Sequence, residues 1–143
     1  MSDSAMFDTR PILTHDAVLA MFQNGAAKAT EMGQPQCLVV VDASGEVMGS
    51  LRMTGAKYLS LRSARAKART SASTGMATGG MPDEFAAKLT AATNNAVTNL
   101  PGGLPVKIDD RLAGAVGVGS GSGEQDVEVC KAMLAAIGAD AVS

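Results

Sequence analysis

The sequence predicts a single α+β domain in which helices cover an antiparallel sheet. Two segments, residues 37–53 and 106–118, each read as a pair of apolar strands joined by a short turn. Segments with helical spacing of apolar residues precede, separate and follow these hairpins. Hairpins produce antiparallel pairing, and helices that alternate with them cover the faces of the sheet. The length of 143 residues suits one such domain.

The N-terminal residues predict an arm followed by a helix. Residues 1–12 are polar and end in Arg-Pro, so we expect a flexible arm, with residues 13–143 as the single domain. Thr14 is the expected N-cap of a helix that ends before Gly33. The apolar and small residues of this helix share one face, namely Val18, Met21, Phe22, Gly25, Ala26 and Ala29.

The first hairpin begins with CLVVVD, an uninterrupted apolar run typical of a strand covered on both faces. The turn DASG, residues 42–45, returns the chain along residues 46–53. Residues 60–73 are rich in alanine and basic residues and predict a helix. Its small-residue face should pack closely on a neighbour and consists of Leu61, Ala64, Ala68 and Ala72.

The second half predicts two more helices around the second hairpin. Pro82 suits the first turn of a short helix that runs through Leu89. The hairpin in residues 106–118 turns at Asp109-Asp110. Ser122 and Gln125 then form the pattern of a capping box at the start of a last helix, which ends at Gly138. The apolar positions of that helix are Val127, Cys130, Met133, Leu134 and Ile137.

Composition excludes several classes of function. The net charge is −2 and the chain has no Trp, three Phe and one Tyr, so neither a polyanion nor stacked bases are expected partners. Cys37 and Cys130 lie in apolar patterns and are expected to be buried thiols. The N-terminal segment lacks the pattern of a signal peptide and no apolar run is long enough to span a membrane. We therefore expect a soluble, cytoplasmic protein.

The glycine-rich stretch GVGSGSGEQD, residues 117–126, does not match the nucleotide-binding motifs. The sixth position of a G-x-G-x-x-G pattern is Ser122, and a P-loop lysine is replaced by Glu124. Acidic residues at a helix start would also repel a phosphate. The stretch therefore predicts a strand end that passes into a capped helix, with a second possible role as a ligand wall.

Three further features leave alternatives open. His15, the only histidine, is either a solvent-facing residue of the first helical turn or an axial haem ligand. The basic run in residues 62–69 is either a solvated face or directs Lys67 or Arg69 into a cleft to bind a carboxylate. The loop PGGLP, residues 101–105, combines restrained prolines with two glycines and suits a tight turn or a rigid pocket wall.

Four segments together resemble one known family. They are VVVDASGEV with RMTGA, ARAKARTSA, LPGGLPV and GAVGVGSGSGEQD, at residues 39–56, 64–72, 100–106 and 114–126. The chain is similar, over residues 12–138, to the GlcG/HbpS-type haem-binding family, which includes the C-terminal domain of PduO-type proteins. The resemblance implies a profilin-like α+β domain in a homo-oligomer, and the hydrophobic content of 46% also favours an oligomer.

The resemblance implies that the protein binds haem, or a similar small acidic ligand, in a pocket near the PGGLP loop. The expected ligand-binding residues are His15, Arg52, Lys67, Arg69, Pro101, Gly102, Gly103 and Gln125. His15 is the expected ligand of the haem iron. The alternative is a cofactor-free isomerase, lyase or hydrolase acting on a small carboxylic acid in a catabolic pathway, with a basic residue anchoring the acid. A structural or regulatory partner without a ligand is a third class.

Overall fold

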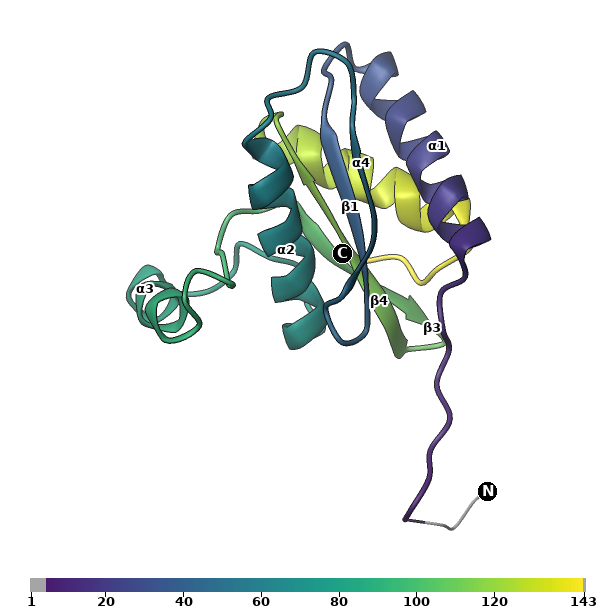
Figure 1. The fold of residues 1–143 in the computed structure, drawn as a ribbon, viewed down its shortest axis with the longest axis vertical. Helices are drawn as coiled ribbons and strands as arrows, with labels where there is room; N and C mark the ends of the chain where they lie inside the picture. The colour runs from purple at the N-terminus through teal and green to yellow at the C-terminus, as the bar shows by residue number, and fades with distance from the viewer. Residues whose placement is uncertain (1–4, 143) are drawn as a thin grey trace.

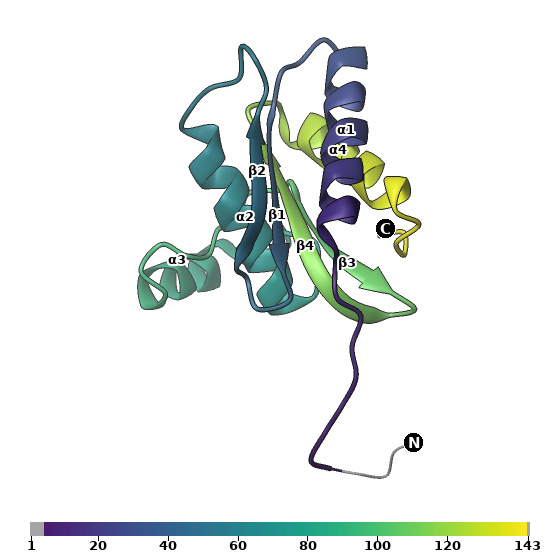
Figure 2. The same ribbon diagram turned by 45° about the vertical axis from the view of Figure 1, so that its right-hand side comes forward.

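The computed structural model describes residues 5–142 and contains a four-stranded antiparallel sheet with helices on both faces (Figures 1 and 2). The strand order is β2-β1-β4-β3. The elements are α1 His15–Glu31, β1 Cys37–Asp42, β2 Val47–Arg52, α2 Ser60–Thr74, α3 Asp83–Ala92, β3 Gly103–Ile108, β4 Arg111–Gly119 and α4 Gly123–Ala136. The predicted α+β class is confirmed, and the arrangement is consistent with a profilin-like fold.

β1 lies inside the sheet and is buried on both faces, as its apolar run predicts. Successive side chains of a strand point to opposite faces. Leu38 and Val40 therefore join the core beneath α1 and α4, whereas Val39 and Val41 join the core beneath α2. Figure 2 shows these layers, with α2 on one side of the sheet and α1 and α4 on the other.

α2 packs directly on the backbone of β4 through its small-residue face. Ala64, Ala68 and Ala72 are buried against the sheet. A Cβ atom placed on Gly117 of β4 would overlap the carbonyl oxygen of Ala64. The close packing predicted for this face is confirmed, and it depends on a glycine in the facing strand.

The predicted caps and turns are present. Thr14 Oγ1 accepts a hydrogen bond from Ala17 N at 3.2 Å and caps α1. Ser122 and Gln125 form the complete capping box of α4. Asp109 and Asp110 both have positive φ, as required for the two-residue turn between β3 and β4.

Two details of the helices differ from the prediction. α3 extends to Ala92, beyond the predicted end at Leu89, and Pro82 is its N-cap instead of a residue of its first turn. In α4, Val127 is only half-buried, whereas Asp126 and Val129 are buried. The buried face of α4 is therefore rotated so that it includes Asp126, which pairs with Lys67 of α2.

The N-terminal arm and α3 lie outside the layers formed by the sheet and the other helices. Residues 5–12 contain no helix or strand and extend away from the sheet (Figure 1), while arm residues 1–4 and Ser143 lie outside the described residues. α3 stands apart from the layers and buries only Ala86. Cys37 and Cys130 are buried free thiols, as predicted. None of the helices within residues 5–142 is long and apolar enough to cross a bilayer.

Candidate functional site

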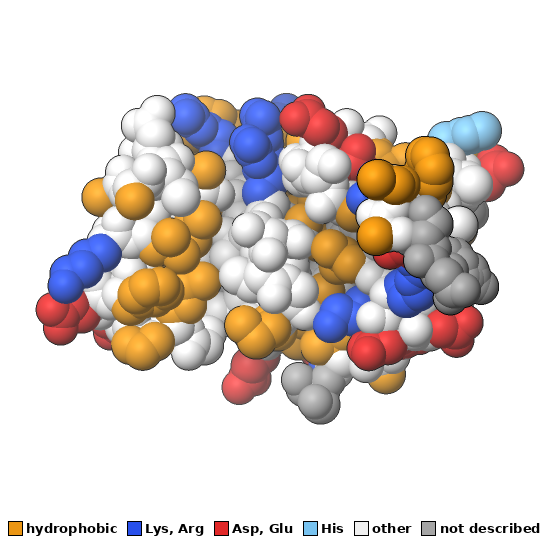
Figure 3. Space-filling model, turned by 90° about the horizontal axis from the view of Figure 1, so that it is seen from below, with side chains coloured by type: hydrophobic (Ala, Val, Ile, Leu, Met, Phe, Trp, Pro, Cys, Tyr) orange, Lys and Arg blue, Asp and Glu red, His pale blue; other side chains and the backbone are white. Residues whose placement is uncertain are grey.

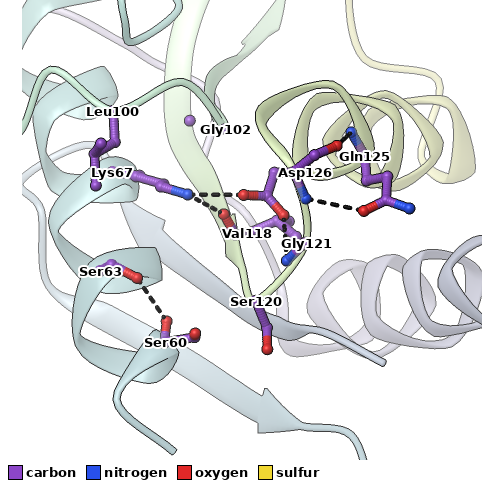
Figure 4. A network of polar contacts seen from close by, with 12 residues as sticks. Ser60, Ser63, Lys67, Leu100, Gly102, Val118, Ser120, Gly121, Gln125 and Asp126 are labelled. Atoms are coloured by element: carbon purple, nitrogen blue, oxygen red, sulfur yellow. Dashed lines mark hydrogen bonds and ion pairs between the residues drawn. The ribbon is translucent and has the colours of Figure 1, made fainter. Parts of the chain in front are cut away.

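A buried ion pair joins α2 to the start of α4. Lys67 Nζ lies 2.9 Å from Asp126 Oδ2, and the two side chains are 5% and 3% exposed. The same ammonium group donates a hydrogen bond to Val118 O at 2.8 Å. The lysine crosses from α2 to the end of β4, where it meets the carboxylate (Figure 4). A buried charge requires such partners, because its transfer from water is otherwise very costly.

The carboxylate of Asp126 accepts bonds from more than the lysine. Gly121 N donates to Asp126 Oδ1 at 3.1 Å. The buried amide of Gln36, turned so that its nitrogen faces acceptors, donates to the same oxygen. Burial raises the pKa of Asp126 above its ordinary value, and the bonds from Lys67 and Gly121 oppose that rise. Burial and hydrogen bonding therefore act in opposite directions on the pKa of Asp126.

A surface pocket of about 270 Å³ lies over this ion pair. We call it the Lys67 pocket. Its walls come from the start of α2, the segment before it, the PGGLP loop and the β4–α4 connection, and are formed by Lys57, Ser60, Ser63, Lys67, Leu100, Pro101, Ser120, Gly121, Gly123 and Asp126. The ammonium group of Lys57 and the hydroxyl groups of Ser60 and Ser120 are the donors of this lining that can face a carboxylate, because Ser63 Oγ donates to Ser60 O and Lys67 Nζ is bonded to Asp126 and Val118.

Ser120 holds two walls of the pocket together. Its φ of 90° is a left-handed conformation that is costly for a residue with a side chain. In this conformation Ser120 Oγ accepts from Lys57 N at 3.0 Å, and Ser120 O accepts from Gln34 Nε2 at 3.1 Å. The strained serine therefore fixes the segment before α2 and the end of α1 against the β4–α4 connection.

The structure brings several predicted ligand residues to this pocket. Lys67 and Pro101 line it. Gly102 lies beneath it with a φ of 115°, and a Cβ there would sit 2.8 Å from Asp126 Cβ and 3.1 Å from Lys67 Nζ. Gly103 is the first residue of β3, and a Cβ there would lie 2.5 Å from Lys67 O. Of the two glycines only Gly102 has a positive φ, so the chain reverses there. Because neither glycine has a side chain, the PGGLP loop can lie directly against Lys67.

Gln125 lies beside the pocket but does not line it. Its Oε1 accepts a hydrogen bond from Ser122 N at 2.9 Å, which completes the cap of α4. In Figure 4 its side chain points away from Lys67, with Asp126 between them. The geometry gives Gln125 a structural role that positions Asp126.

The other predicted ligand residues lie elsewhere. Arg52 borders a more apolar depression of about 600 Å³ between the end of α1 and β2. Arg69 faces outward from α2 together with Arg62 and Arg65. The side chain of His15 is 88% exposed in the first turn of α1, 3.6 Å from Asp16. Residues 5–142 contain no cluster of three or more His, Cys, Asp and Glu side chains able to hold a metal ion.

Sequence reasoning missed Asp126 as the partner of Lys67. One local signal was present for the lysine, because Lys67 is three residues from Ala64 and four from Ser71 and so shares the small-residue face. No local signal marks Asp126, since an acidic residue in a first helical turn ordinarily faces solvent and stabilises the helix dipole. For the serines and glycines that line the pocket, the sequence likewise predicted only a connection between a strand and a helix.

Solved structures resemble the chain in fold and sequence over most of its length. Three solved structures resemble the chain: the PduOC:heme complex, Klebsiella pneumoniae protein ORFY and a double mutant of Streptomyces reticuli HbpS. Their TM-scores are 0.84, 0.83 and 0.80, and their sequence identities are 25%, 26% and 26%. The matches cover 93%, 96% and 94% of this chain and 100%, 100% and 93% of the respective relatives.

No curated protein sequence matches the chain significantly. A family model does match, over residues 13–135, and it describes haem degrading proteins that are HbpS-like. This match spans nearly the whole domain and includes both hairpins and the Lys67 pocket. The chain therefore belongs to the HbpS-like family.

Proposed function

We propose that this protein binds haem and that the Lys67 pocket receives an acidic group of the ligand. The observation that carries the proposal is the lining of the pocket, in which Lys57 and the hydroxyl groups of Ser60 and Ser120 border a space next to Leu100. Lys57 makes no ion pair with any residue from 5 to 142. An ammonium group without a counter-ion beside hydroxyl donors is suited to a propionate carboxylate.

The residues of the pocket fit the edge of haem better than its iron. Leu100 is 54% exposed and offers apolar contact at the rim of the pocket. The lining contains no imidazole, thiol, thioether or phenol group, and these are the usual protein ligands of haem iron. Bound haem would supply the redox chemistry of its iron. The residues of this chain would hold the carboxylate, orient the ring edge and exclude water beside the buried ion pair.

His15 remains our candidate ligand of the iron, because it is the only histidine and its imidazole is 88% exposed. It begins α1, whereas Gln34, just after the end of α1, bonds to Ser120 in the pocket wall. The 17 residues of α1 therefore place His15 about 25 Å from Gln34 and the wall of the Lys67 pocket. One haem held by both sites must therefore lie between two copies of the chain.

We also propose that the protein is a homo-oligomer, as a haem bound between two copies of the chain requires. Hydrophobic side chains gather on the side of the molecule that carries α3 (Figure 3). Phe85 on α3 and Met76 near the end of α2 are 55% and 64% exposed. Exposed apolar surface of this kind is typical of an interface between subunits.

A hemin titration of the purified protein tests the proposal. We expect a shifted Soret band that saturates at one haem per chain. Lys57→Ala and Ser63→Leu should each weaken hemin binding, the first by removing the cation and the second by filling the pocket. Lys131→Ala, on the exposed side of α4 and outside the pocket lining, is the matched control and should leave hemin binding unchanged. An absent or unsaturable shift overturns haem binding, and unchanged affinity in both pocket variants overturns the location.

The buried ion pair favours a second candidate, a cofactor-free enzyme acting on a small carboxylic acid of a catabolic pathway. A carboxyl group whose pKa is raised by burial, placed in a pocket wall, is a typical general acid or base. In this role Lys57 and the serines anchor the substrate acid and Asp126 moves a proton. Incubation with small hydroxy and keto acids should then give turnover without haem, and Asp126→Asn should abolish it. Absence of turnover across such a panel excludes this candidate.

A further inference from the structure

The outward face of α2 carries three arginines at helical spacing. Arg62, Arg65 and Arg69 lie three and four residues apart, so their side chains leave the helix on one side. Lys67, which belongs to the same basic run, points the opposite way into the core. The three arginines are therefore separate from the Lys67 pocket.

The guanidinium groups of these three arginines have no polar partner among residues 5–142. Among residues 5–142 no acidic group lies within ion-pair distance of Arg62, Arg65 or Arg69, and none of their guanidinium groups makes a hydrogen bond. Like charges at this spacing repel one another and destabilise a helix. A bound anion would offset this repulsion.

A second segment closes the space beside the arginines. The connection from α3 to β3 brings Asn94, Asn95 and Ala96 against α2, which leaves a pocket of about 220 Å³. Asn94 and Asn95 have φ values of 55° and 66°, an uncommon conformation for two successive residues with side chains. Their side-chain amides make no hydrogen bond with any residue from 5 to 142. Three cations and two amide donors thus line one concave space.

We infer that this space, the arginine pocket, binds a compact multivalent oxyanion carrying phosphate or carboxylate groups. Guanidinium groups match both kinds of group with paired hydrogen bonds, and the amides supply further donors. The volume of about 220 Å³ suits a phosphate or a di- or tricarboxylate. The site is distinct from the Lys67 pocket, so it does not depend on the proposed haem binding.

Calorimetric titration of the full chain with pyrophosphate and, separately, with citrate at constant ionic strength tests this inference. We expect saturable binding of at least one of the two, and the stronger one identifies the ligand as phosphate or carboxylate. Arg65→Gln should weaken that binding by about tenfold or more, since it removes a charge-assisted bond. Arg111→Gln, at the exposed first residue of β4 and outside the lining of the arginine pocket, removes the same charge and should leave the binding unchanged.

Three outcomes overturn the inference. They are no saturable binding of either anion, equal weakening by Arg65→Gln and Arg111→Gln, and a loss of hemin affinity in the triple variant Arg62→Gln/Arg65→Gln/Arg69→Gln. The last result would show that the arginines belong to the haem site. Failure of hemin to bind the unaltered chain, by contrast, leaves the anion titration unaffected, so the two proposals fail separately. Circular dichroism of each variant checks that α2 is retained.

Discussion

Lys67 Nζ on α2 and Asp126 Oδ2 on α4 lie 2.9 Å apart with almost no exposure to solvent. Lys67→Met should destabilise the fold by about 3–5 kcal/mol, because it leaves a buried carboxylate without its cation. The double variant Lys67→Met/Asp126→Asn should recover most of this loss, since no charge then remains buried. Urea unfolding measures both values. A single variant within about 1 kcal/mol of the parent would contradict the assigned role.

The carboxyl of Asp126 also predicts a dependence of stability on pH. Burial raises its pKa above the ordinary value of 3.8. Between the unfolded and folded pKa values the folded chain binds more protons, so this group makes the free energy of unfolding fall as pH rises. Asp126→Asn removes that contribution. Urea unfolding at closely spaced pH values from 3.8 upward should show a more positive slope for the variant, and identical slopes would refute the prediction.

Gly102 allows a separation of backbone strain from packing. Gly33→Ala introduces a side chain at a φ of 69° with no atom within 4 Å, so it should cost about 1 kcal/mol through strain alone. Gly102→Ala adds close contacts to Asp126 and Lys67 and should cost about 1–3 kcal/mol more. We also expect it to weaken hemin binding more than Gly33→Ala does. Equal losses of stability and full hemin affinity in both variants would restrict PGGLP to a turn.

The two cysteines should be inert in the folded protein. Burial raises the pKa of the Cys37 thiol and of the Cys130 thiol, so little reactive thiolate is present at pH 8. We expect no alkylation by iodoacetamide at that pH until urea unfolds the chain, followed by labelling of both thiols. Mass spectrometry counts the labels. Rapid labelling of the native chain would show that one of these elements opens locally.

His15 tests whether the haem bridges two copies. His15→Ala should change the free energy of unfolding by less than about 0.5 kcal/mol, because the side chain is exposed and makes only a contact with Asp16. The same variant should lose the saturable Soret shift. Light scattering of the parent with and without hemin should show an oligomer in both samples. Unchanged hemin affinity in the variant would restrict His15 to a surface role, and a parent that stays monomeric with hemin bound would exclude the bridge.

Much of the fold was readable from the sequence because its signals are local. A capping residue such as Thr14 or Ser122 acts within one helical turn, and the Asp109-Asp110 turn joins adjacent strands. The small-residue face of residues 60–73 and the doubly covered strand 37–41 follow in the same way from spacing within one element. These features require no knowledge of what packs against them.

The site depended on contacts between distant elements. Lys67 and Asp126 are 59 residues apart, and they pair only because the lysine side chain reaches from α2 past the end of β4 to the start of α4. From the sequence, Lys67 and Arg69 were equal candidates for a residue that points into a cleft. In the folded chain Lys67 is buried, whereas Arg69 faces outward. The sequence by itself determined the helices, hairpins and caps. Tertiary packing alone decided which charged side chains are buried, because burial depends on the surface that faces each side chain.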